Sequence, residues 1–298
     1  MKFTISSNNK KMTYKEIVRK IKNLEIQGAK NIAIKGVEAF GMKIKNTSDK
    51  KLLEKYAKEI ISTRPTEPAL RNGIDFCLNN LGKLPSPAKE AVKHFLESNE
   101  KIAEIGAKKI KNGMIIFTHC HSSTVEAILI KAKKEGKKFE VYNTETRPKF
   151  QGRITAMELA KAGIKVTHMA DSAGRSMIKK ADLFLFGCDA ITSEGFLINK
   201  IGTESLVDAA NEAGIPAYSC TDSWKFDPET IGGQEEEIEQ RDPKEIWDSP
   251  PKNVKIYNPA FEIIRPDKFT GVITEFGVYK AETLVLELQN KYPHLFKK

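Results

Sequence analysis

The chain is poor in cysteine: its 298 residues include only four, and no two of them form a C-x-x-C pair. Cys77, Cys120, Cys188 and Cys220 are too dispersed for a zinc ribbon or a disulfide framework. No apolar run approaches the roughly 20 residues that cross a bilayer, and the polar segment 1–11 has no apolar core of a signal peptide. We therefore expect a cytoplasmic protein with free thiols and no membrane association.

Acidic residues are outnumbered. The chain has 49 Lys+Arg against 39 Asp+Glu, which gives a net charge of +10. A basic balance suits anionic partners such as phosphorylated metabolites or nucleic acid. The lysines are spread over almost every expected helix and alternate with acidic residues, which is typical of solvated helix faces. Nucleic acid is therefore not the partner that we expect.

Two patterns of apolar residues divide the chain. In residues 13–111 they recur at helical spacing, which predicts helices over 52–60, 69–81 and 88–110. From residue 113 short apolar runs alternate with helical segments, the pattern of βαβ units in a parallel sheet. We therefore predict an α/β protein in which an N-terminal helical domain, residues 1–111, precedes a Rossmann-like, doubly wound and mostly parallel sheet in residues 112–298. The expected strands are 114–118, 139–142, 165–169, 183–186 and 216–219, with later candidates at 254–257 and 271–274, and the helices between them are 125–135, 151–162, 175–180 and 203–213.

One segment, residues 222–251, interrupts this alternation. It contains an acidic run at 235–239 and ends at Pro250 and Pro251. An insertion of this length in a compact fold is commonly a lid or a subunit contact.

Polar residues follow each predicted strand. Ligands of open parallel sheets bind beyond the carboxyl ends of the strands, so we expect these loops to converge on one pocket. The loops are residues 118–124, 143–149, 171–174, 187–190 and 221–225.

The first of these loops runs into a predicted helix. Backbone N–H groups there, with the hydroxyls of Ser122, Ser123 and Thr124, can bind an anion such as phosphate. The alternative is plain N-capping by the same residues. The loop is not a Walker loop and no G-x-G-x-x-G occurs, so ATP and dinucleotides are not expected.

Cys120 stands between two histidines and ahead of that helix. Both features lower the pKa of a thiol and favour the thiolate, which acts as a base or nucleophile. One alternative is a buried cysteine that behaves as a small apolar side chain, our interpretation of Cys77 and Cys220. Another is a metal site with His119 and His121. Alternate residues of a strand face opposite ways, so these three do not readily share one ion, and no metal is expected.

Asp189 follows an apolar strand, where a carboxylate costs free energy unless it is paired or used. Desolvation would raise its pKa and make it a candidate general acid; the alternative is a turn or helix N-cap aspartate. Further candidates beside predicted turns would hold phosphate or hydroxyl groups together, although each alone is typical of surface charge. They are Arg64, Arg147, Asn199, Lys200 and Lys225.

Five motifs occur in the order in which one superfamily carries them, and the chain resembles that superfamily. It unites the alpha, beta and delta subunits of translation initiation factor 2B, methylthioribose-1-phosphate isomerase and archaeal ribose-1,5-bisphosphate isomerase. The T-H-C-H-S form of the first loop resembles the last of these branches most, as do residues 224–230, 241–243 and 258–261. The five motifs are residues 62–66 (STRPT), 118–122 (THCHS), 144–148 with 151–153 (TETRP, QGR), 187–189 (GCD) and 199–203 (NKIGT).

The resemblance implies an aldose–ketose isomerase that converts ribose 1,5-bisphosphate to ribulose 1,5-bisphosphate as a homodimer or hexamer, with no metal or organic cofactor. Cys120 would be the proton acceptor and Asp189 the proton donor. The phosphorylated ribose would be contacted by Gln27, Gly28, Ala29, Lys30, Arg64, Ser122, Ser123, Thr124, Asn199, Lys200 and Lys225.

Three residues depart from the pattern of these isomerases. Gln27 and Phe276 stand where arginine is usual, and Ser123 where the bisphosphate isomerases have lysine. Fewer charge-assisted hydrogen bonds to phosphate would weaken binding or change the substrate, although Lys30 can substitute for the first arginine. Two other readings therefore stay open. One is a non-catalytic regulatory subunit that binds a phosphorylated metabolite or nucleotide, against which the Cys–Asp pair argues, and the other is methylthioribose-1-phosphate isomerase.

Overall fold

The computed structural model describes residues 12–234 and 238–296. The polar start, 1–11, and the first residues of the acidic run, 235–237, lie outside the described residues. No helix of the described part is long and apolar enough to cross a membrane.

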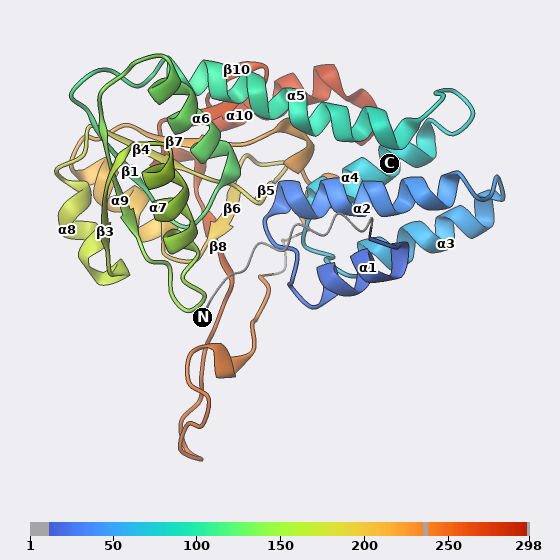
Figure 1. Ribbon diagram of the computed structural model, residues 1–298, viewed down its shortest axis with the longest axis horizontal. Helices are drawn as coiled ribbons and strands as arrows, with labels where there is room; N and C mark the ends of the chain where they lie inside the picture. The colour runs from blue at the N-terminus through green and yellow to red at the C-terminus, as the bar shows by residue number, and fades with distance from the viewer. Residues whose placement is uncertain (1–11, 235–237, 297–298) are drawn as a thin grey trace.

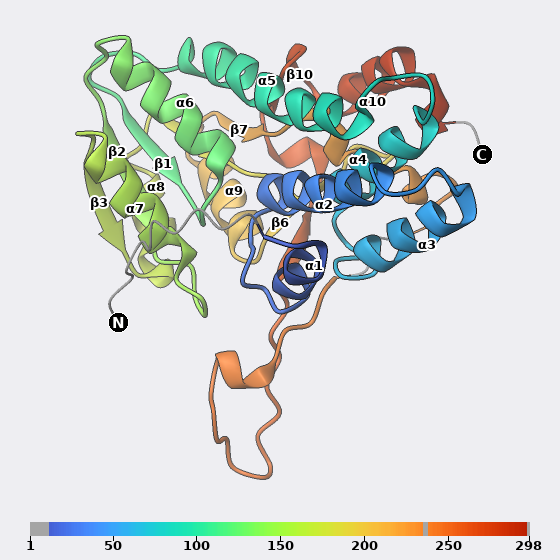
Figure 2. The ribbon, with the colours of Figure 1, turned by 45° about the vertical axis from the view of Figure 1, so that its right-hand side comes forward.

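The first part of the chain is helical, as predicted (Figures 1 and 2). Its helices begin at recognisable signals: Thr13 and Glu16 form a capping box, Asp49 caps the third helix, and proline opens the fourth and fifth. Their apolar faces meet in one buried core that includes Phe40 and Leu70. The helices are α1 (Tyr14–Lys22), α2 (Ala29–Ile44), α3 (Lys50–Ile61), α4 (Pro68–Asn79) and α5 (Pro87–Ala107).

A seven-stranded sheet follows, in the order β10-β9-β7-β4-β1-β2-β3. Every neighbouring pair is parallel except β9 and β10, so the predicted mostly parallel sheet is confirmed. The strands are β1 (Ile115–Thr118), β2 (Glu140–Thr144), β3 (Lys165–Met169), β4 (Leu183–Phe186), β7 (Ala217–Cys220), β9 (Gly271–Thr274) and β10 (Gly277–Tyr279).

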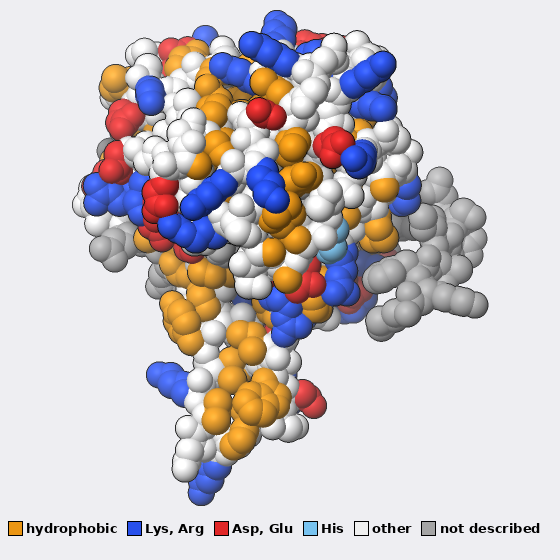
Figure 3. All heavy atoms as spheres, turned by 90° about the vertical axis from the view of Figure 1, so that its left-hand side faces the viewer, with side chains coloured by type: hydrophobic (Ala, Val, Ile, Leu, Met, Phe, Trp, Pro, Cys, Tyr) orange, Lys and Arg blue, Asp and Glu red, His pale blue; other side chains and the backbone are white. Residues whose placement is uncertain are grey.

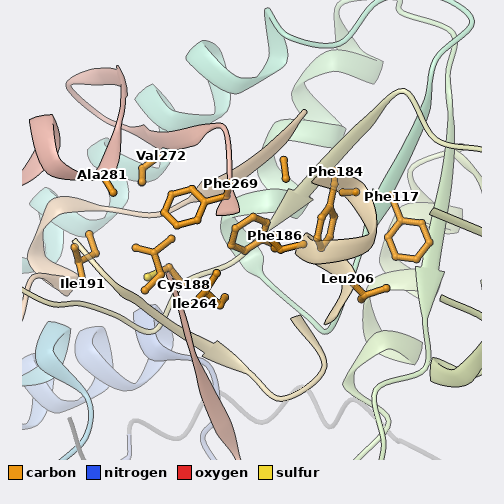
Figure 4. Close-up of a cluster of buried hydrophobic side chains, with 14 of the residues drawn as sticks. Phe117, Phe184, Phe186, Cys188, Ile191, Leu206, Ile264, Phe269, Val272 and Ala281 are labelled. Carbon is orange, nitrogen blue, oxygen red and sulfur yellow. The ribbon is translucent and has the colours of Figure 1, made fainter. Parts of the chain in front are cut away.

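Alternate residues of the central strand β4 face two different cores. Leu183 and Leu185 pack with apolar residues of α5, α6 and α7, whereas Phe184 and Phe186 pack with α8, α9 and α10 (Figure 4). Helices therefore cover both faces, as a doubly wound sheet requires. These helices are α6 (Ser123–Lys134), α7 (Gln151–Lys161), α8 (Gly174–Ile178), α9 (Thr203–Glu212) and α10 (Ala281–Lys291).

α5 belongs to both halves of the molecule. Phe95, near its middle, lies in the core of the helical part, and Ile102, about two turns later, lies in the core beneath the sheet. The proposed boundary at residue 111 thus falls just after a helix that the two halves share.

The sequence prediction missed a second, antiparallel sheet in the order β5-β6-β8. Its strands are β5 (Ala190–Ile191), β6 (Leu197–Lys200) and β8 (Phe261–Ile264). β5 is too short to show a period, and β8 pairs with β6 from some 60 residues away along the chain. The helix α10 and the strand β10 were also missed. The predicted strand 254–257 is wrong, because these residues form no ladder with the described chain.

Residues 241–258, which we call the arm, project from the body of the molecule (Figures 1 and 2). A bridge between Gln240 and Pro259 closes its base. Apolar side chains gather on its surface (Figure 3), among them Trp247, 48% exposed, and Tyr257, 74% exposed.

Candidate active site

A cavity of about 390 Å³ lies at the carboxyl ends of β1 and β4, bordered by the start of α2. Its wall includes Cys120, Asp189 and every residue that the sequence analysis assigned to the substrate: Gln27, Gly28, Ala29, Lys30, Arg64, Ser122, Ser123, Thr124, Asn199, Lys200 and Lys225. The residues come from both halves of the chain. Arg147 is the exception among the candidates, because it lines a smaller neighbouring pocket with Lys149.

Two helix N-termini reach this cavity. Ser122 caps α6, where its Oγ accepts a hydrogen bond from the N–H of Val125 at 3.4 Å. Gly28 caps α2 with a φ of 83°, a left-handed conformation that glycine adopts without strain. The side-chain amide of Gln27 donates to the carbonyl oxygen of Leu24 at 2.8 Å. Because helix N-termini carry partial positive charge and free N–H groups, this end of the cavity favours an anion.

Three lysines line the cavity without a carboxylate within ion-pair distance in the part of the chain that the structure describes: Lys30, Lys200 and Lys225. Burial, followed by the charge of Lys225, lowers the pKa of Lys30. The Nζ of Lys200 lies 4.7 Å from the ring centroid of Phe261. Unpaired cations in a confined space are suited to phosphate.

The arginines, by contrast, are already paired. Nη2 of Arg64 lies 3.2 Å from Glu67 and 2.9 Å from Glu239. Arg241 lies 3.4 Å from Glu239 and 2.8 Å from Glu245. Sequence analysis had placed Arg241 in a family motif but not in the site, and it missed Glu67, although Glu67 directly follows the R-P-T segment that contains Arg64.

The backbone of Cys120 is held in a left-handed conformation, with a φ of 65°. Its N–H donates to Thr146 Oγ1 at 3.0 Å, and its carbonyl oxygen accepts from Thr155 Oγ1 at 3.0 Å. The N–H groups of Thr146 and Arg147 donate in turn to the carboxylate of Asp171, at 2.8 and 2.7 Å. The fixed backbone therefore determines where the thiol points.

These hydrogen bonds to the backbone of Cys120 explain why one prediction was wrong. The loops 143–149 and 171–174 were expected to line the pocket, but no residue of either does so. Thr146 of the loop 143–149 bonds the backbone of Cys120, and Asp171 of the loop 171–174 bonds the backbone of Thr146 and Arg147. The loops after β1, β4 and β7 reach the cavity, as predicted.

The predicted low pKa of the Cys120 thiol is wrong. Burial raises it to about 11, and Lys200 with the N–H of His121 offset only part of that rise. The neighbouring histidines add no positive charge, since burial lowers the pKa of both. Cys77 and Cys220 are fully buried, in line with their interpretation as apolar side chains.

Each histidine has a structural partner. The Nδ1 of His119 lies 2.5 Å from Thr144 Oγ1 and its Nε2 lies 2.9 Å from the carbonyl oxygen of Ile201. The Nδ1 of His121 lies 3.1 Å from Thr155 Oγ1. In residues 12–234 and 238–296 no group of three or more His, Cys, Asp or Glu side chains is arranged to hold a metal ion.

Phe276, the third departure from the isomerase pattern, does not line the cavity. Its ring packs 6.0 Å from that of Tyr292, and the Nζ of Lys291 lies 5.4 Å from its centroid. The departures that bear on this cavity are therefore Gln27 and Ser123.

A helical half, a doubly wound sheet and a cation-rich cavity between them define an α/β protein with a site for an anionic ligand. Residues 25–281 match the Initiation factor 2 subunit family, and the chain belongs to this family.

Its relatives include enzymes and an initiation factor. The chain is 36% identical to the ribose 1,5-bisphosphate isomerase of Pyrococcus furiosus, with 95% of each chain covered. It is 33% identical to the methylthioribose-1-phosphate isomerase of Desulforamulus reducens, with 89% of this chain and 86% of that one covered. The crystal structure of a translation initiation factor eIF-2B from Pyrococcus horikoshii superposes with a TM-score of 0.80 at 30% identity, covering 90% of this chain and 96% of that one.

Proposed function

We propose that the chain is an aldose–ketose isomerase that converts ribose 1,5-bisphosphate to ribulose 1,5-bisphosphate. The observation that carries the proposal is the placement of a thiol, Cys120, and a carboxyl, Asp189, in one cavity with three lysines that have no carboxylate partner in the described chain. The name of the Pyrococcus furiosus relative supports this substrate.

In this mechanism Asp189 gives its proton to the ring oxygen and the ring opens. The Cys120 thiolate then takes the proton from C2, which leaves an enol between C1 and C2. The C2 hydroxyl returns a proton to Asp189, and the Cys120 thiol delivers its proton to C1, so the ketose forms and both groups are restored. The pair therefore needs one acid and one base at the start.

The cations have two tasks in this scheme. Lys30, Lys225 and the N-termini of α2 and α6 bind the phosphate groups. Lys200, whose charge already acts to lower the pKa of Cys120, favours the thiolate. No organic cofactor or metal takes part in these steps.

The test is an isomerase assay on ribose 1,5-bisphosphate with the wild type, Cys120→Ser and Asp189→Asn. We expect turnover by the wild type and a loss of at least about 1,000-fold in each variant, because each removes one of the two proton carriers. Ligand binding is measured in parallel by calorimetry. A wild type that binds the bisphosphate and does not turn it over would reject the isomerase.

That outcome would favour a regulatory subunit that binds a phosphorylated metabolite or nucleotide. The observation behind this second candidate is that neither Gln27 nor Ser123 supplies a cation, and the amide of Gln27 is engaged with Leu24. A third candidate, methylthioribose-1-phosphate isomerase, keeps the Cys–Asp chemistry, and assaying that substrate alongside distinguishes it.

We also propose that the protein acts in the cytoplasm as a homodimer or hexamer. The arm supports self-association, because it projects from the body (Figure 1) and a second copy would bury its exposed Trp247 and Tyr257.

A further inference from the structure

Glu67 is a buried carboxylate in the wall of the cavity, only 3% exposed. It stands at the N-cap position of α4, yet its side chain makes no capping hydrogen bond. Its Oε1 accepts from Arg64 at 3.2 Å, whereas its Oε2 is buried without a hydrogen-bond partner in the described chain. A buried carboxylate oxygen without a donor costs free energy, so its retention calls for a use.

Pairing with Arg64 does not account for this oxygen. A carboxylate that serves only as a partner for arginine would typically use both oxygens in a bidentate pair. Here the same Nη2 of Arg64 lies between Glu67 and Glu239, at 3.2 and 2.9 Å, and Oε2 of Glu67 is left over.

The surrounding charge shows which part of a ligand Glu67 can meet. Burial, and after it the nearby negative charge of Asp189, raises the pKa of Glu67, while Arg64 and Lys225 act in the opposite direction. A phosphate next to two carboxylates would be repelled. A phosphate group is therefore favoured near Lys30 and the helix N-termini, and the wall at Glu67 suits the uncharged, hydroxyl-bearing part of the ligand.

We propose that Glu67 is a substrate-positioning residue that accepts, at Oε2, a hydrogen bond from a hydroxyl group of the sugar. This inference rests on the proposed function, since it takes the ligand to be a sugar phosphate. It assigns to the site a contact that discriminates a hydroxylated sugar from a bare phosphate. It also places the carbon skeleton beside Asp189, where the proton is to be delivered.

The test measures how much the sugar adds to phosphate binding. Calorimetry gives the dissociation constants of inorganic phosphate and of ribose 5-phosphate, and their ratio isolates the sugar. In Glu67→Gln the amide oxygen faces Arg64, a pure donor, so the NH₂ group replaces Oε2 and accepts nothing. Glu67→Met removes both oxygens at similar size and serves as the second variant.

We expect the ratio to fall ~10- to 100-fold in Glu67→Met, because the sugar hydroxyl then loses its partner in a buried site. In Glu67→Gln we expect a fall of about 10-fold, because the hydroxyl loses its acceptor and can only receive a hydrogen bond from the NH₂ group. The matched control is Glu239→Gln, which removes the other partner of Arg64 and does not line the cavity. If Glu67 acts only through Arg64, this control and Glu67→Gln change the ratio alike.

An unchanged ratio in Glu67→Met, an equal fall in the Glu239→Gln control, or a wild type that binds ribose 5-phosphate no more tightly than phosphate would each overturn the inference. Thermal unfolding confirms that each variant is folded. Failure of the proposed function looks different: the wild type would show the sugar preference in calorimetry and no turnover of ribose 1,5-bisphosphate.

Discussion

Lys225 donates a hydrogen bond from its Nζ to the carbonyl oxygen of Cys188, the residue directly before Asp189. The contact joins the turn after β7 to the loop after β4, which are separated by 37 positions in the sequence. Burial lowers the pKa of Lys225, but Asp222 and Asp189 outweigh it and raise the pKa, so the side chain stays an ammonium ion. One lysine thus fixes the backbone that carries the proposed acid and keeps a positive charge beside it.

Replacing this lysine should affect both stability and ligand binding. In Lys225→Met the buried carbonyl oxygen of Cys188 loses its charged donor, which we expect to cost about 3 kcal/mol of unfolding free energy. Phosphate affinity should fall about 10-fold or more. Urea unfolding and calorimetry measure the two effects. The exposed Lys244→Met on the arm is the matched control, and equal behaviour of the two variants would contradict the assigned role.

The raised pKa of Cys120 predicts slow thiol chemistry at neutral pH. Since the reactive species is the thiolate, alkylation by iodoacetamide should speed up about tenfold per pH unit from pH 7 towards the pKa of about 11. Mass spectrometry locates the label, and Cys120→Ser should remain unlabelled because Cys77, Cys188 and Cys220 are buried. A rate that levels off near pH 7 would show an activated thiol instead.

Glu67 predicts a pH-dependent stability of the ligand-free protein. Its pKa is raised by burial and by Asp189, against Arg64 and Lys225, with Glu239 adding to the rise. Below the ordinary glutamate pKa of about 4.3 both the folded and unfolded states hold the proton. Between that value and the raised pKa of the folded state, the folded protein binds a proton that the unfolded chain has released. The free energy of unfolding therefore falls as the pH rises through this range, and the contribution of Glu67 is lost above the raised pKa.

Glu67→Gln cannot ionise, so its melting temperature should rise relative to the wild type between pH 5 and pH 8. Thermal scans at both pH values measure the difference, with the exposed Glu104→Gln as the control. A difference that stays constant with pH would mean that Glu67 does not titrate in this range.

The arm predicts the state of association. Trp247→Ser combined with Tyr257→Ser removes the two large exposed aromatic side chains of the arm, so we expect the dissociation constant of the assembly to rise at least about 10-fold. Light scattering during size-exclusion chromatography gives the mass. Leu286→Ser, an exposed position on α10, should leave the mass unchanged. A monomeric wild type would reject the proposal.

Gly152, in the first turn of α7, occupies a position that leaves no room for a side chain. A Cβ there would lie 1.8 Å from the carbonyl oxygen of Thr144 on β2. Gly152→Ala should therefore push the helix from the sheet and cost about 2 kcal/mol of unfolding free energy. Ala160→Gly, an exposed position of the same helix, should cost only about 1 kcal/mol for the loss of helix propensity.

The sequence predicts best those features that depend on the local pattern of apolar residues and on the order of the strands along the chain. The strands 165–169 and 183–186 agree residue by residue with β3 and β4. The second is recognisable because a buried parallel strand is a continuous apolar run. Cys120, Asp189 and Lys225 line one cavity because the loops after parallel strands meet at one edge of a sheet.

Features that depend on contacts between residues far apart in the sequence could not be predicted from the sequence. The thiol of Cys120 was expected to be acidic from its flanking histidines, but the bonds of His119 to Thr144 and Ile201 arise only in the folded chain. Phe276 was counted as a missing cation of the site, and only its packing on Tyr292 shows that it lies elsewhere. Glu67 escaped notice because a carboxylate is conspicuous only once its burial is known.

The cavity lies between the two halves of the chain, with Lys30, Arg64 and Glu67 on the helical side and Cys120 and Asp189 on the sheet side. Catalysis at such an interface depends on how the halves are placed, whereas the secondary structure of each half does not. A slight rotation of the helical half would leave every helix and strand intact and still separate the cations from the thiol. On warming or in mild denaturant, ligand binding and activity should therefore be lost well before the circular dichroism changes. A tightly bound anion should bring the two transitions closer together.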